Sequence, residues 1–298
     1  MGIVLRILVE VPDYKKQHYL PVCYLKNFSL QPELGRRAPI WRFDGKTTRE
    51  VPVDSQCRED YFYSKSRASL AERFFQSSEK LFVHFLSVVA SGRIPSKADY
   101  YGLLLSLFDM HIRTEAYENA TGREELDAYK MRALGIKRVL VGRVESPPDP
   151  SDDEIISSLQ RNWRVGILPN LSEVELFTST HPSILWGERR KGETVNAVIL
   201  PLKPNLLAIG YNRNFVRIEG NRVTTADALS LNRLQCHNAS AAIFSARELK
   251  YSAAQAVREE LELRRQVRAT TSLDGWDMGA LKFPITALSF LRPGAIVL

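Results

Sequence analysis

The amino-acid sequence predicts an α+β fold in which a helix-rich N-terminal half packs with a mainly antiparallel sheet and C-terminal helices. Two long amphipathic segments lie between residues 69 and 114, and several short β-prone segments follow between residues 174 and 218. Helical periodicity returns after residue 225. Because the predicted helices and strands are grouped along the chain, we do not expect a parallel sheet wound from alternating strands and helices.

The first predicted elements are a helix at residues 21–28 and a strand at residues 39–44. The helix places Tyr24, Leu25 and Phe28 at helical spacing, and its proline suits the first turn, where the missing N–H needs no partner. The strand alternates apolar and polar residues and ends at an Asp-Gly pair, which is typical of a hairpin. This strand could join later strands in one sheet.

A pair of helices is expected next. Ser69 and Glu72 have the spacing of a capping box, which predicts a helix from this point to about Ala90. A second helix is expected from about Ser96 to Thr114. Because the turn between the two is short, the helices should pack as an antiparallel pair.

The second half begins with the proline-rich acidic segment at residues 145–153, which we interpret as a surface loop. A short helix is predicted at residues 154–163. Short β-prone runs predict strands at 174–180, 195–200, 206–211 and 214–218, and helical periodicity predicts helices at 225–245 and 252–267.

We expect residues 17–268 to form one composite α+β domain, with residues 145–153 on its surface. Residues 1–16 would then be an N-terminal extension and residues 269–298 an irregular C-terminal tail. The chain has 298 residues, which is enough for one large domain or two small ones. The pattern of elements favours the single domain.

Composition restricts the classes of partner. The formal net charge of +7 favours polyanionic partners, so we expect nucleic acid or a nucleotide. The three cysteines, Cys23, Cys57 and Cys236, have no zinc-binding spacing and suit a reducing compartment, which predicts a cytoplasmic location. No apolar run approaches the length of a membrane-spanning helix, so no membrane partner is expected. The oligomeric state is not predicted.

Two glutamates are candidate catalytic residues. Glu72 and Glu79 are seven residues apart, so they share one face of the predicted helix with apolar side chains. A carboxylate on such a face needs a partner or a raised pKa, and Arg113 or His111 on the next helix, or Arg93 at its start, could be that partner. The pair could hold a divalent metal or act as acid and base. A buried ion-pair network between the two helices is the structural alternative. The cofactor remains open.

His18 is the third candidate catalytic residue, and Tyr19 beside it is a candidate for substrate binding. Both lie just before the helix at residues 21–28, where the helix dipole would attract an anion and lower the pKa of the histidine. Both could instead only cap the helix. Ser179, at a strand end, and Asn232, on the inner face of a helix, are further candidates for substrate binding, together with Arg113.

The string His-Tyr-Leu-Pro-Val-Cys-Tyr-Leu-Lys-Asn-Phe at residues 18–28 resembles the opening of a domain-of-unknown-function family, DUF 4238. Four later features resemble the family pattern in the same order: residues 59–63, the Glu72/Glu79 pair, residues 177–182, and residues 200–204 followed by Asn232. The family implies no assigned activity. Its pattern has Asp where this chain has Thr180, and if that Asp is a ligand or a base, this chain has lost it.

These observations lead to two hypotheses. The first is an intracellular enzyme or effector that acts on a phosphate-rich substrate such as RNA, DNA or a nucleotide. Carboxylates, a basic group and a proton shuttle are the residue types that such chemistry needs. The alternative is a non-catalytic binding or regulatory module, which the replacement at Thr180 favours. A single concave pocket that gathers the candidate residues would support the first hypothesis.

Overall fold

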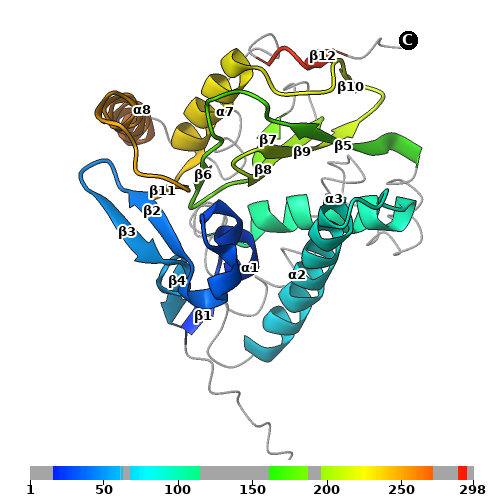
Figure 1. The fold of residues 1–298 in the computed structure, drawn as a ribbon, viewed down its shortest axis with the longest axis horizontal. Helices are drawn as coiled ribbons and strands as arrows, with labels where there is room; N and C mark the ends of the chain where they lie inside the picture. The colour runs from blue at the N-terminus through cyan, green and yellow to red at the C-terminus, as the bar shows by residue number, and fades with distance from the viewer. Residues whose placement is uncertain are drawn as a thin grey trace, which may run out of the picture.

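The computed structural model describes residues 16–60, 62, 68–114, 161–186, 196–270 and 288–293, and Figure 1 shows the arrangement of their helices and strands. The fold is α+β, as predicted, and its sheets are antiparallel. The predicted surface loop at residues 145–153 and the predicted N-terminal extension up to residue 15 lie outside the described residues.

Strands are more frequent near the N-terminus than predicted. β1 (Lys16–His18) pairs with β4 (Arg58–Asp60), and β2 (Pro39–Phe43) forms a hairpin with β3 (Thr48–Pro52). All four precede the first long helix, so the N-terminal half is less helical than expected. β1 and β4 are short and polar, and they lack the alternating pattern that identified β2.

The segments between these strands are short helical turns. α1 (Val22–Leu25) continues into the 3₁₀ helix η1 (Lys26–Phe28), and η2 (Pro32–Arg37) and η3 (Val53–Ser55) follow. The predicted helix at residues 21–28 is therefore a single α-turn with a 3₁₀ extension. Tyr24, Leu25 and Phe28 are fully buried, as the spacing predicted.

α2 (Ala68–Ala90) and α3 (Lys97–Ile112) form the predicted helix pair. Phe85 near the end of α2 contacts Tyr100 near the start of α3, whereas Ser106 donates to the Ser78 carbonyl group. The later residue of α3 thus contacts the earlier residue of α2, so the two helices are antiparallel. Ser96 caps α3 through a reciprocal hydrogen-bond pair with Asp99, a complete capping box.

A four-stranded antiparallel sheet lies between two helical layers. Its strands run in the order β5 (Trp163–Pro169), β9 (Leu206–Asn212), β8 (Ala197–Lys203) and β7 (Ile184–Trp186). Alternate residues of β8 enter two different cores: Val198 and Leu200 pack with α2 and α3, whereas Ile199 packs with α7 (Thr225–Asn238). Figure 1 shows α3 on one side of this sheet and α7 on the other.

Gly210 on β9 makes the close approach of α3 possible. A Cβ atom at this position would meet Leu104 Cδ1 and would lie 2.8 Å from Val198 Cγ1. Glycine removes that clash and lets two leucines of α3 lie directly on the sheet. The helix that carries Arg113 at its end is therefore held firmly against the sheet.

A second four-stranded sheet has the order β3, β2, β11 (Ile243–Ser245) and β6 (Thr178–Ser179). The strand near Trp41 thus joins later strands, but these are β6 and β11 and not the predicted strands at 195–211. β11 was predicted as the end of a helix. α7 instead ends at Asn238, because the chain turns at residues 239–242 before it enters the sheet.

Two features near the sheets were not predicted. Residues 163–169 form β5, which pairs with β9 along its whole length, and the short helix predicted at residues 154–163 is described only at residues 161 and 162, which are helical. The alternate residues Trp163, Val165 and Ile167 of this strand pack into the core shared with α2 and α3. The predicted irregular tail contains β12 (Leu291–Pro293), which pairs with β10 (Val216–Ile218). α8 (Tyr251–Thr270) agrees with the predicted last helix.

Among the described residues, no helix combines the length and the apolar character needed to cross a membrane.

Candidate functional site

A cavity of about 370 Å³ opens between α1, η2 and α2, beside the end of α3. Three of the residues predicted from the sequence line it: His18, Glu79 and Arg113. These residues come from β1, α2 and the C-terminal cap of α3, so the fold brings together segments that are far apart in the sequence. The other polar side chains in its lining include Lys26, Arg36 and Gln76.

Arg113 holds the inner side of the cavity together. Its side chain is only 2 % exposed, and its Nη2 lies 2.9 Å from Glu79 Oε1. Nη1 lies 3.6 Å from the buried Asp109 carboxylate, and Nη2 also donates to the His18 carbonyl group at 3.1 Å. The guanidinium group covers the ring of Phe75 at 4.6 Å, a cation–π contact. Arg113, one of the three basic residues predicted as possible partners of the glutamates, pairs with Glu79 and joins three elements.

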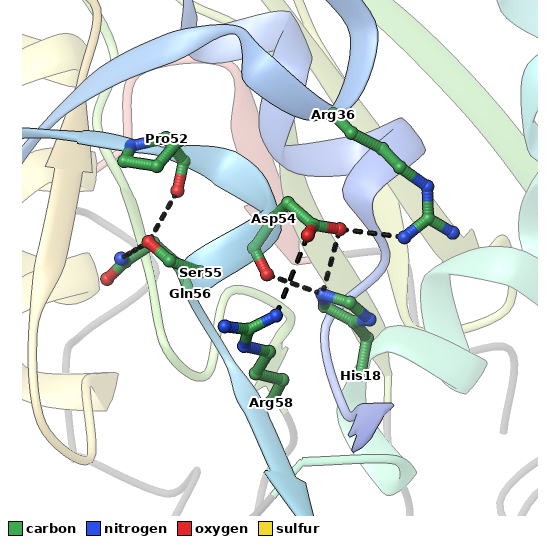
Figure 2. A network of polar contacts seen from close by, with 7 residues as sticks. All are labelled: His18, Arg36, Pro52, Asp54, Ser55, Gln56 and Arg58. Carbon is green, nitrogen blue, oxygen red and sulfur yellow. Dashed lines mark hydrogen bonds and ion pairs between the residues drawn. The ribbon is translucent and has the colours of Figure 1, made fainter. Parts of the chain in front are cut away.

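The His18 imidazole belongs to a polar network around Asp54 (Figure 2). Its Nε2 lies 3.1 Å from the Asp54 carbonyl oxygen and 3.9 Å from the Asp54 carboxylate. The same carboxylate binds Arg36 at 2.7 Å and contacts Arg58 at 3.6 Å. Because a carbonyl oxygen only accepts, Nε2 carries the proton in the neutral ring and Nδ1 carries the lone pair.

Burial lowers the pKa of His18 below its ordinary value of 6.5, and the hydrogen bond to Asp54 only partly opposes this effect. The lowered pKa agrees with the sequence prediction, but the predicted cause was wrong. α1 has only four residues, and His18 lies on β1, so a helix dipole does not explain the shift. The imidazole is therefore neutral near pH 7.

Cys23 on α1 and Lys26, the first residue of η1, lie on the face of this helical segment for which the sequence predicted no role. Tyr24, Leu25 and Phe28 enter the core, so the opposite face of the same turn lines the cavity. The helical spacing of the three apolar residues would have been enough to identify this face. Burial raises the pKa of the Cys23 thiol to about 12, so the thiol is protonated and is a poor nucleophile.

Two predicted residues lie near the cavity without a described role in it. Tyr19 is 8 % exposed, and its ring packs against Phe62 with 5.0 Å between centroids. Glu72 belongs to α2, but its side chain lies outside the described residues. The predicted glutamate pair is therefore represented in the described cavity by Glu79.

Ser179 and Asn232 lie elsewhere, where the second sheet meets α7. The Ser179 hydroxyl donates to Gln235 Oε1 at 2.8 Å and is fully buried. The Asn232 side chain accepts from the Phe177 N–H and donates to the Glu175 carbonyl group, both at 2.8 Å. Both side chains fasten β6 and the preceding segment to α7, and neither lines the cavity with His18.

The arrangement allows binding and proton transfer. Within the described ranges, no group of three or more His, Cys, Asp or Glu side chains has the geometry of a metal site. The cavity instead offers a neutral imidazole, one carboxylate held by an arginine, and the cations Lys26 and Arg36. Such a set can bind an anion and can accept a proton from a bound group.

Comparison with known proteins gives one match. Residues 16–140 match the model of a family described as "Protein of unknown function (DUF4238)". The resemblance predicted from the sequence is therefore confirmed over this segment, which contains every residue named above as lining the cavity. No curated protein and no solved structure matches the chain.

Proposed function

We propose that this chain binds a phosphate-bearing ligand in the His18–Glu79–Arg113 cavity and acts on it, as an enzyme or effector for nucleotides or nucleic-acid ends. The observation that carries the proposal is that these three residues line one concave site with Lys26 and Arg36. A volume of about 370 Å³ lies at the lower end of ordinary ligand pockets. It suits a single nucleotide better than a duplex.

His18 is the proposed proton-transfer group. A general base should be unprotonated at the working pH, and burial keeps the pKa of this imidazole below 6.5. Its Nε2–H is held by the Asp54 carbonyl group at 3.1 Å, which fixes the ring and leaves the basic lone pair on Nδ1. Glu79 and Arg113 would then orient the ligand.

The test is a ligand screen on the full chain, with binding followed by calorimetry and turnover by product analysis. We expect saturable binding of nucleotides or of short single-stranded RNA, and loss of turnover in His18→Gln with binding retained. Arg49→Gln is the matched control, because this arginine lies on β3 and does not line the cavity. Absence of binding for every phosphate-bearing probe would refute the proposal.

The alternative proposal is a non-catalytic binding or regulatory module. One observation favours it: Arg113 lies 2.9 Å from the Glu79 carboxylate, so this carboxylate already serves in an ion pair that joins α2 to α3. The same screen separates the two proposals, because a module would bind ligand with no turnover and His18→Gln would change affinity alone.

We also propose a cytoplasmic location. None of the three cysteines forms a disulfide bond, which supports a reducing compartment. Fractionation of cells that express the tagged full chain would test this.

A further inference from the structure

We infer that the ligand of the cavity is a phosphate monoester of a hydroxyl-rich body, with its phosphate at Lys26 and its hydroxyl groups at Glu79. A sugar phosphate and a nucleoside monophosphate share this chemistry. The inference rests on the proposed function and makes it more specific. It assigns a binding role to Lys26, which the sequence prediction did not include.

Lys26 is the cation of the cavity whose charge is not neutralised. The guanidinium group of Arg36 binds Asp54 at 2.7 Å, and that of Arg113 binds Glu79 at 2.9 Å. Across the described residues, no carboxylate forms an ion pair with Lys26. Its side chain lines the cavity and is half-buried, so an anionic ligand group would gain more from it than from a fully solvated lysine.

The charge of the site sets the charge of the ligand. Among the residues whose side chains the structure describes, the cations that line or adjoin the cavity are Lys26, Arg36, Arg58 and Arg113, and the carboxylates are Asp54, Glu79 and Asp109. One positive charge is in excess. A phosphate monoester, with a charge of about −1.5 to −2 near pH 7, suits this site. A triphosphate would place several further negative charges beside Glu79, and the described residues offer no metal cluster to neutralise them.

Glu79 determines what the rest of the ligand must be. Arg113 binds its Oε1, and 30 % of the side chain remains exposed. A carboxylate only accepts hydrogen bonds, so its ligand partner must be a donor, as a hydroxyl group is. Glu79 and Lys26 both line this cavity of about 370 Å³, together with Cys23. One small ligand can therefore reach both.

The experiment is calorimetry on the full chain with five probes: ribose 5-phosphate, AMP, n-propyl phosphate, ribose and ATP. We expect ribose 5-phosphate or AMP to bind at least about tenfold more tightly than n-propyl phosphate, which lacks hydroxyl groups, and than ribose, which lacks phosphate. The tighter binder of the two, ribose 5-phosphate or AMP, shows whether the ligand is a sugar phosphate or a nucleoside monophosphate. This comparison uses the unaltered protein and does not depend on any variant folding.

Substitutions of Lys26 and Glu79 then test which residue binds the phosphate and which binds the hydroxyl groups. Lys26→Gln should weaken binding of the preferred monoester about tenfold or more, because a charge-assisted contact is lost. Lys80→Gln should not change it, because this exposed lysine follows Glu79 on α2 and does not line the cavity. Glu79→Gln should reduce the ratio of the affinity for the preferred monoester to the affinity for n-propyl phosphate.

The possible failures are distinguishable. If ATP binds as tightly as the monoesters, or if n-propyl phosphate does, this inference is wrong and the proposed phosphate-binding function stands. An unchanged affinity in Lys26→Gln would also overturn the inference. If no phosphate-bearing probe binds, both the inference and the proposed function fail.

Discussion

The guanidinium group of Arg113 lies 2.9 Å from the carboxylate of Glu79, and this ion pair fastens the end of α3 to α2. Because the same guanidinium group donates to the His18 carbonyl oxygen, it also fixes β1. The contacts that position the candidate site are thus also contacts that hold the fold together. The sequence allowed two interpretations of Glu79, as a site residue or as a member of a buried ion-pair network. Both apply to it.

Replacement of Arg113 by Met should lower the free energy of unfolding by about 3–5 kcal/mol, because it leaves the buried Asp109 and the half-buried Glu79 without their cation. Arg36→Met removes an ion pair whose arginine is 74 % exposed, so it should cost at most about 1 kcal/mol. Urea unfolding of both variants checks this difference. Equal losses would show that the Arg113 network contributes no more than a surface pair.

A second polar cluster lies behind the site and is entirely buried. His111 Nδ1 lies 3.2 Å from the Ser183 carbonyl oxygen and 3.1 Å from His181 Nε2. Thr114 bonds His181 Nδ1 and donates to the His111 carbonyl group. Burial lowers the pKa of His111 to about 4. His111 is thus a hydrogen-bonded core residue.

This cluster should make stability depend on pH. The unfolded chain binds a proton at His111 near pH 6.5, and the folded chain does so only near pH 4, so stability is full above pH 6.5 and falls as the pH drops toward 4. The loss attributable to His111 is about 3 kcal/mol. His111→Asn should show a flatter profile in urea unfolding between these pH values. Parallel profiles for the two proteins would contradict the assignment.

Thr180, which lies outside the segment that matches the family model, has a structural task that bears on the predicted replacement of an Asp at this position. Its Oγ1 accepts from the backbone N–H groups of Ser240 and Ala241 at 2.9 and 3.0 Å, and Ala242 N lies at 3.4 Å. These groups belong to the turn between α7 and β11. A carboxylate could accept the same donors, so the residue at this position orders the turn, and its identity does not argue against catalysis at the cavity.

Thr180→Val should therefore destabilise the protein by about 1–3 kcal/mol, because buried N–H groups lose their acceptor. Thr180→Asp should retain most of the stability. The exposed Thr225 provides the control, and Thr225→Val should lie within about 0.5 kcal/mol of the wild type. Chemical unfolding of the three variants is the measurement. If Thr180→Val were as stable as Thr180→Asp, the hydrogen bonds to Thr180 Oγ1 would not stabilise the turn.

The predictable part of the fold is the part with strong periodicity. The β2–β3 hairpin and the α2–α3 pair follow from spacing in the sequence, whereas Arg113 was only one of three basic residues that could pair with the glutamates. β5 was missed although Trp163, Val165 and Ile167 alternate along it, because so short an alternation directly follows a segment predicted as helix. The end of α7 was missed because the turn that follows it is held by Thr180, which lies just after β6 and is distant in the sequence. Local patterns do not contain such long-range contacts.

The site was predicted in part for the same reason. His18, Glu79 and Arg113 were identified from residue type and helix position, and the structure gathers them. Ser179 was predicted from its place at a strand end and Asn232 from its place on the inner face of a helix, but buried polar groups at such places also fasten one element to another. Only the fold distinguishes these cases. The Asp54 network at His18 joins η2, η3 and β4, and no sequence spacing marks it.

The pH dependence of activity should reveal the state of His18. If His18 is the base of the proposed enzyme, kcat/KM should fall only below pH 6.5, because burial lowers the pKa and the imidazole stays neutral to a lower pH than a free histidine does. His18→Gln should lose this acid limb together with most of the turnover. The measurement is a kcat/KM profile from pH 4.5 to 8 on the substrate found in the ligand screen. An acid limb above pH 6.5 would mean that the Asp54 carboxylate raises the pKa of His18 more than burial lowers it. The base would then be protonated over much of the working pH range.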